Sequence, residues 1–156
     1  MWRKIRPYVG FSAIALGVGA LSAVLTRREM AAFSRLVQPP LSPPAWLFPV
    51  VWTALYLLMG VGMAAVWRGS RGAGRRGAVT LWAAQLAVNF FWTILFFSLQ
   101  ARLFAFFWLV LLFALVLSMT ASFDRYSKAA ARLQLPYLAW LVFAGYLNLA
   151  VYLLNR

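Results

Sequence analysis

Cysteine and histidine are both absent from this chain, and its only acidic residues are Glu29 and Asp124. The absence of cysteine and histidine excludes thiol redox chemistry, cysteine nucleophiles, and thiolate or imidazole ligation of a metal ion or haem. The chain also has no pair of neighbouring carboxylates, no histidine-based catalytic set and no glycine-rich phosphate loop. The sequence therefore predicts no metal site, no required cofactor and no catalytic constellation of its own.

Apolar residues are in large excess: 65% of the chain is hydrophobic, 17% is aromatic, and the mean hydropathy is +0.81. A soluble domain of this length could not bury so much apolar surface. Charged residues separate uncharged stretches that each match the roughly 20 residues a helix needs to cross a bilayer. An apolar segment in lipid must satisfy its own backbone polar groups, which favours helices.

The sequence thus predicts an all-α integral membrane protein that forms one domain over residues 1–156, a bundle of five transmembrane helices. The predicted helices lie near 7–26, 45–67, 78–100, 103–123 and 133–154, and a loop covers 27–44. The basic residues before position 7 and the sequence Ala20-Leu21-Ser22 also resemble a signal peptide. However, the apolar run 7–26 is longer than the roughly 7–15 residues of a signal peptide, which favours a helix.

The net charge of +13 comes from 15 lysine and arginine residues. In a soluble protein this charge would suggest nucleic acid, but here the basic residues fall at the ends of the predicted helices, where they meet lipid headgroups. Ten lie on one side of the predicted bundle: Arg3, Lys4, Arg6, Arg68, Arg71, Arg75, Arg76, Arg125, Lys128 and Arg132. Five lie on the other: Arg27, Arg28, Arg35, Arg102 and Arg156.

This asymmetry predicts a cytoplasmic N-terminus, because cytoplasmic loops carry the excess of basic residues. We expect a multi-pass protein of a bacterial cell membrane, with the lipid bilayer as its main partner and no nucleic acid. Neither acidic residue lies inside a predicted helix, which argues against a proton-coupled pump, since such pumps need ionisable groups within the membrane.

The predicted helix 78–100 carries two amides, Gln85 and Asn89, which share a face because they are four residues apart. Trp82 and Trp92 flank that face. Uncharged amides in membrane helices commonly form hydrogen bonds between helices. The alternative is an interior pocket with amide donors and indole walls, and the residues alone leave both interpretations open.

Two other predicted helices carry comparable stripes. In 133–154 the stripe consists of Tyr137, Trp140, Ala144 and Asn148; in 45–67 it consists of Trp52, Tyr56, Met59 and Met63. An aromatic and methionine stripe is more often part of a core than of a pocket. If the three stripes converge, however, they build an apolar aromatic cavity with a few amides, the usual profile of a small-molecule site.

Three motifs resemble those of the translocator protein family, which includes the tryptophan-rich sensory proteins and the peripheral benzodiazepine receptor. They are QPPLSPPAWLFPVVWTALYLLMGVG at 38–62, the Q-L-x-x-N-x-x-W-x-x-L-F-F pattern at 85–97, and the P-Y-L-A-W-x-x-F-A-x-x-L-N pattern at 136–148. The resemblance spans nearly the whole chain. Two positions depart from it: Gln38 replaces the family's lysine and Leu41 its first tryptophan.

The resemblance implies a five-helix bundle, usually a homodimer, with a cavity beneath the first loop. It implies porphyrins and related tetrapyrroles as ligands, and it matches Trp52 and Trp140 to two tryptophans tied to porphyrin binding and light-dependent porphyrin breakdown. Leu149, Tyr152 and Arg156 fit a loose sterol motif, but Tyr152 is displaced from the family's tyrosine position. Together with the stripes, the resemblance gives these candidate ligand-binding residues: Trp46, Trp52, Tyr56, Gln85, Asn89, Trp92, Tyr137, Trp140, Ala144, Leu147 and Asn148.

The expected function is that of a receptor-like membrane protein that binds porphyrins and acts in tetrapyrrole sensing, regulation or translocation. The alternatives are a light-dependent porphyrin-degrading protein, a passive transporter of hydrophobic ligands, and a structural subunit with no ligand. Four prolines lie within 39–44. Because proline fixes φ and lowers the entropy lost on ordering, this loop is predicted to be a stiff lid or, alternatively, a rigid connector without a gating role.

Overall fold

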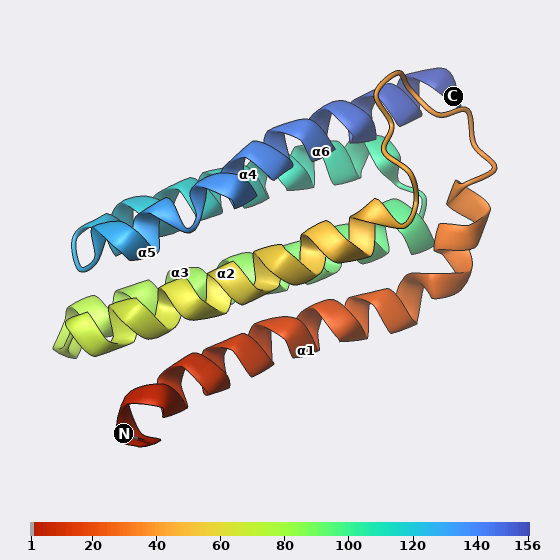
Figure 1. The fold of residues 1–156 in the computed structure, drawn as a ribbon. Coiled ribbons are helices and arrows are strands. Elements are labelled where there is room, and N and C mark those ends of the chain that lie inside the picture. Colours follow the sequence, from red (N-terminus) through yellow and green to blue (C-terminus); the bar gives the residue numbers. More distant parts are fainter. Residues whose placement is uncertain (1) are drawn as a thin grey trace.

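The computed structural model describes residues 2–156, and the chain folds into long helices that run side by side (Figure 1). In chain order these are α1 (Trp2–Phe33), α2 (Leu47–Gly69), α3 (Gly72–Thr93), a π-helix η1 (Ile94–Ser98), α4 (Arg102–Asp124), α5 (Lys128–Arg132) and α6 (Leu135–Leu154). No strand occurs among residues 2–156. The helices provide five segments long and apolar enough to cross a membrane, which confirms the predicted five-helix bundle.

The first loop is shorter than predicted. The interpretation of 27–44 as loop is wrong for its first part, because α1 continues through Phe33 and the loop comprises residues 34–46. Arg27, Arg28 and Glu29 end the apolar stretch but not the helix, since arginine and glutamate are good helix formers. At 32 residues, α1 is about 48 Å long, so it extends beyond a hydrocarbon core of about 30 Å. Glu29 lies in this extension.

The helices form two groups with α3 between them. In Figure 1, α1 runs along α2, and α4 runs along α6 on the other side of the bundle. Gly60 of α2 allows a close approach to α1, because a side chain there would collide with the backbone of Ser12. A continuous core of buried aliphatic, aromatic and methionine side chains fills the space between the helices, so the chain forms a single packed unit.

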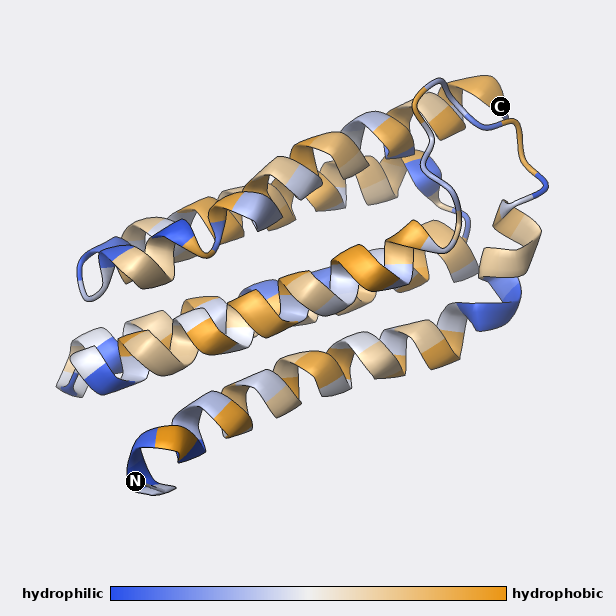
Figure 2. Ribbon diagram, in the orientation of Figure 1, coloured by the Kyte–Doolittle hydropathy of each residue, from blue (hydrophilic) through white to orange (hydrophobic). Residues whose placement is uncertain are grey.

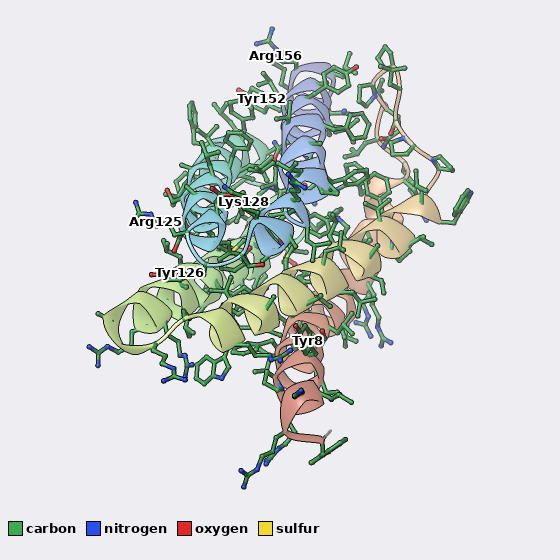
Figure 3. All side chains as sticks on the ribbon, turned by 60° about the vertical axis from the view of Figure 1, so that its left-hand side comes forward. Tyr8, Arg125, Tyr126, Lys128, Tyr152 and Arg156 are labelled. Carbon is green, nitrogen blue, oxygen red and sulfur yellow. The ribbon has the colours of Figure 1, made fainter. Side chains whose placement is uncertain are left out.

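The two ends of the bundle differ in charge. The N-terminus and the α2–α3 and α4–α5 connections lie at one end, and loop 34–46 and the C-terminus lie at the other (Figure 1). Hydrophilic residues gather at these ends, whereas hydrophobic residues predominate along the helices (Figure 2). Figure 3 labels Arg125 at the α4–α5 connection, Lys128 at the start of α5 and Arg156 at the opposite end. The larger basic group therefore lies at the N-terminal end, which we call the basic end.

Candidate functional site

A cavity of about 500 Å³ lies at the end of the bundle beneath loop 34–46. Its wall comes from α1, the loop, α2, α3, η1 and α6. Most of the wall is apolar, with aromatic rings from α2, α3, η1 and α6. This volume and composition are those of a small-molecule site, since such sites measure about 300–1,000 Å³ and are lined mainly by apolar and aromatic groups.

Trp52 of α2 stands at the centre of the aromatic wall. Its ring centroid lies 5.7 Å from that of Tyr56, 6.3 Å from Trp92, 6.2 Å from Tyr137 and 6.5 Å from Trp140. The planes of Trp52 and Trp140 are nearly perpendicular, at 86°. These distances are typical of favourable aromatic pairs. The side chains therefore support one another as a preformed wall, and the predicted convergence of the three stripes occurs here.

The structure brings most of the predicted site residues to the cavity and leaves three away from it. Eight line the wall: Trp52, Tyr56, Asn89, Trp92, Trp140, Ala144, Leu147 and Asn148. Trp46 does not line it and is 65% exposed at the start of α2, where an indole ring suits the membrane interface. Gln85 and Tyr137 are fully buried and do not line the cavity either.

Gln85 and Tyr137 act instead through a hydrogen-bond chain that ends at the cavity wall. The Gln85 Nε2 amide donates to Met59 Sδ at 3.6 Å, and the Tyr137 hydroxyl donates to Gln85 Oε1 at 3.0 Å. The Asn89 Nδ2 amide in turn donates to Tyr137 Oη at 3.0 Å. Both interpretations of the amide pair therefore hold in part: Gln85 joins helices, and Asn89 joins helices while it also lines the cavity.

Asn148 holds another part of the wall in place. The Trp92 indole N–H donates to Asn148 Oδ1 at 3.2 Å, and Asn148 Nδ2 donates to the backbone oxygen of Arg102 at 2.7 Å. Asn148 is thus satisfied on both sides by the protein and ties α6 to α3 and to the start of α4. The same indole stacks on Phe96 of η1, with ring centroids 5.5 Å apart. This arrangement gives Trp92 a single orientation.

Sequence reasoning missed the contributions of α1 and η1. Gly19, Ser22 and Thr26 line the cavity from α1, and Phe96 and Phe97 line it from η1. These α1 residues share one face of the helix. Because α1 is apolar on all sides and shows no clear amphipathic pattern, its periodicity did not distinguish residues that face the cavity from residues that face lipid. The π-helix left no sequence signal that we recognised, although π-helical turns are frequent at functional sites.

Loop 34–46 crosses the end of the bundle and is attached to α6. Asn155 forms two hydrogen bonds with the backbone of Val37: its Oδ1 accepts from the Val37 N–H and its Nδ2 donates to the Val37 oxygen, each at 3.0 Å. The Tyr146 hydroxyl donates to the oxygen of Pro40 at 2.7 Å. We call these three hydrogen bonds the loop latch. They place the loop over the cavity, whose wall includes Ser42, Pro43 and Ala45.

The two positions that depart from the family motif have different environments. Gln38 lines the cavity and stabilises the loop from within, because its Nε2 donates to the Phe33 oxygen at 3.0 Å and its Oε1 accepts from the Ser42 hydroxyl at 3.1 Å. Leu41 is 81% exposed and has a φ of 68°, a conformation that costs energy for a branched residue. Gln38 therefore has a defined role in shaping the loop, whereas Leu41 does not line the cavity.

The sterol motif lies apart from this cavity. Leu149, Tyr152 and Arg156 do not line it. Figure 3 shows Tyr152 and Arg156 near the C-terminal end of α6. The positions of these residues therefore add no support for sterol binding in the cavity beneath the loop.

Five membrane-spanning segments define an integral multi-pass membrane protein, and the aromatic cavity at one end is its candidate small-molecule site. Comparison with known proteins adds the family. Residues 11–154 match the TspO/MBR family, and the chain belongs to it, as the three motifs predict.

The relatives cover nearly the whole chain. It is 37% identical over 147 residues to the tryptophan-rich protein TspO of Chlorobaculum tepidum, a match that covers 91% of each chain. It is 35% identical over 145 residues to the translocator protein of Bos taurus, covering 91% of this chain and 86% of that one. The translocator protein of Homo sapiens is 34% identical over 149 residues, covering 94% and 88%.

Proposed function

We propose that this protein binds porphyrins or related tetrapyrroles in the cavity beneath loop 34–46 and acts as a membrane receptor in tetrapyrrole sensing, regulation or translocation. The observation that carries this proposal is the pair Trp52 and Trp140, which line one cavity with ring centroids 6.5 Å apart. Indole faces offer large apolar contact area to a flat aromatic ligand. The names of relatives, among them translocator proteins, agree with a receptor or translocator role.

The polar groups near the cavity suit a ligand with an apolar ring and acidic substituents. Few polar atoms line the wall, so the ring contributes most of the contact. Arg27, Arg28 and Arg35 lie at the cavity end of α1 and just beyond it, and all three are exposed. Because each exposed charge contributes little free energy, these arginines would orient the propionates of a bound porphyrin more than they would raise its affinity.

A dark titration of the purified protein with protoporphyrin, followed by quenching of tryptophan fluorescence, tests the proposal. We expect saturable binding that is weakened in Trp52→Phe/Trp140→Phe. Trp2→Phe is the control, because Trp2 is 67% exposed and lies at the basic end, away from the cavity. Quenching that does not saturate, or that is the same in all three proteins, means partition into the detergent micelle and refutes the proposal.

Light-dependent porphyrin breakdown is the second candidate function, and the same tryptophan pair favours it. Two indoles on one wall would lie beside a bound porphyrin that absorbs light and passes energy to dioxygen. The protein would then supply position, and the ligand would supply the photochemistry. The test is loss of the porphyrin absorption bands on illumination in air, absent in the dark and reduced in Trp52→Phe/Trp140→Phe.

Passive passage through the centre of the bundle has less support. Below the cavity, Met59, Met63 and Val66 of α2 and Leu112 and Met119 of α4 are all fully buried in the core. A ligand of porphyrin size would have to displace this packing to reach the basic end. We therefore favour binding and release at the cavity end. Flux of protoporphyrin across proteoliposomes, compared with empty liposomes, tests the alternative.

A further inference from the structure

Two arginines at the basic end lie against aromatic rings. Arg75 of α3 covers Trp67 of α2, with its guanidinium carbon 4.3 Å from the centroid of the ring. Arg68 of α2 lies over the ring of Tyr8 of α1 at 5.8 Å, and its Nη1 donates to the Tyr8 hydroxyl at 3.5 Å. Both distances are within the roughly 6 Å of a cation–π contact. Because Trp67 and Arg68 are consecutive residues, these contacts form one cluster, and we call Arg68 and Arg75 the arginine pair.

The surrounding contacts orient the arginine pair and leave several of its donors free. Phe11 of α1 packs on Trp67, with ring centroids 5.6 Å apart. The Arg75 Nε and Nη2 both donate to the Ser70 oxygen, at 3.0 and 2.6 Å. Each arginine carries five N–H donors, and the hydrogen bonds within residues 2–156 do not use the Nη1 of Arg75 or the Nε and Nη2 of Arg68. Arg68 is exposed and Arg75 is half-buried, so the pair lies at the surface.

No carboxylate neutralises the arginine pair. The chain has only two acidic residues, and Glu29 lies in the extension of α1 at the cavity end. Asp124 lies at the basic end, but it forms an ion pair with Lys128, whose Nζ is 3.1 Å from Oδ2. Within residues 2–156 neither Arg68 nor Arg75 forms an ion pair. The pair is therefore positive and preoriented, and the planar guanidinium suits phosphate oxygens because it can form two parallel hydrogen bonds with them.

The position of the arginine pair favours a lipid over a soluble phosphate compound. The start of α1 and the α2–α3 connection lie together at the basic end, where the hydrophobic part of the bundle ends (Figures 1 and 2). Trp67 beside the pair is typical of the headgroup level of a membrane, where tryptophan is enriched. An exposed apolar face of α1 begins next to Tyr8 and runs toward the cavity end; it consists of Val9, Ala13, Gly17, Ala20 and Val24. A soluble phosphate would contact the arginines alone, whereas a phospholipid would contact the arginines and this face.

We infer that the basic end carries a binding site for an anionic phospholipid, with the arginine pair on the phosphate group and the exposed face of α1 against an acyl chain. Tyr8 and Trp67 are positioning residues, because they hold the two guanidinium groups. The site does not depend on the proposed function, since it lies at the opposite end of the bundle from the cavity (Figure 1).

Native mass spectrometry of the purified protein in a neutral detergent tests the inference. The anionic probe is dioctanoyl phosphatidylglycerol, and the zwitterionic probe is dioctanoyl phosphatidylcholine. We expect the wild type to prefer phosphatidylglycerol and Arg68→Gln/Arg75→Gln to bind it about 30-fold more weakly, because each basic residue near a lipid surface contributes a factor of about five.

The matched control is Arg71→Gln/Arg76→Gln, which removes the same charge from the same end of the bundle. Both of these arginines are exposed, and within residues 2–156 their side chains form no hydrogen bond and no cation–π contact. The control should therefore bind phosphatidylglycerol within about threefold of the wild type.

The outcomes separate a site from general attraction to charge. Equal weakening in the two double variants, or equal binding of the two lipids by the wild type, overturns the inference. An excess of inorganic phosphate should leave phosphatidylglycerol bound, and displacement of the lipid would show a site for soluble phosphate instead. If Arg68→Gln/Arg75→Gln does not fold, as judged by thermal unfolding, Arg68→Gln alone decides: we expect about fivefold weaker binding of phosphatidylglycerol, and unchanged binding refutes the site.

Discussion

The loop latch can be weakened by one substitution, Asn155→Ala, which removes both hydrogen bonds to Val37 and leaves the Tyr146–Pro40 hydrogen bond in place. The two hydrogen bonds to Val37 are exposed, so water replaces them and each contributes at the low end, about 0.5–1 kcal/mol. The substitution also removes the hydrogen bond from Asn155 Nδ2 to the Val151 oxygen, but that bond does not involve the loop. The open state of the loop would gain about 1–2 kcal/mol relative to the closed state. If the loop must open before a ligand leaves, release should become about 5- to 30-fold faster.

Stopped-flow fluorescence measures this rate directly. Protein loaded with protoporphyrin in the dark is mixed with an excess of empty lipid vesicles, and the transfer of porphyrin fluorescence is followed. Ser118→Ala is the matched control, because Ser118 is exposed on α4 and its hydroxyl bonds only the Ala114 oxygen of its own helix. An unchanged release rate in Asn155→Ala, with the thermal unfolding transition preserved, refutes the lid and leaves the loop as a rigid connector.

The remaining predictions concern packing and topology. Gly60→Ala should lower the thermal unfolding midpoint, because the new Cβ collides with the Ser12 backbone at a cost of about 1–3 kcal/mol. The matched control is Gly17→Ala, where the new Cβ has no neighbour within 4 Å, so this variant should be neutral or slightly stabilising. Equal midpoints would contradict the close approach of α1 and α2. Because the chain has no cysteine, single cysteines report topology: an impermeant maleimide should label Ser34→Cys on intact cells and Ala73→Cys only after permeabilisation. The reverse pattern would overturn the predicted cytoplasmic N-terminus.

The amino-acid sequence determines the class of this protein because the relevant signals are local. Alternation of uncharged stretches with basic connections specifies membrane-spanning helices wherever the chain lies in lipid. The motifs from 38 to 148 identify the family, which the match over residues 11–154 confirms. The same motifs contain the eight predicted site residues that the structure places on the cavity wall, because the spacings of three and four put them on common helix faces.

Tertiary structure decides what lies across from these faces. Trp46 belongs to the same motif as Trp52, but the start of α2 leaves it exposed. Gln85 and Asn89 share a face, and Tyr137 of α6 forms hydrogen bonds with both amides, yet only Asn89 lines the cavity. Helical spacing specifies the direction in which a side chain leaves its own helix, but not how far away the next helix lies. It therefore could not distinguish the residues that line the cavity from those that are exposed or buried in the core.

The loop and α1 show the same limit. Charged residues at 27–29 end the apolar run, but whether the helix ends with it depends on contacts, and here α1 continues to Phe33. The latch between Val37 and Asn155 joins residues that lie 118 positions apart, and nothing in either segment predicts the other. Local composition determined that this chain crosses a membrane as five helices; the register between helices, which only packing specifies, decided which side chains enclose the cavity and what holds the loop above it.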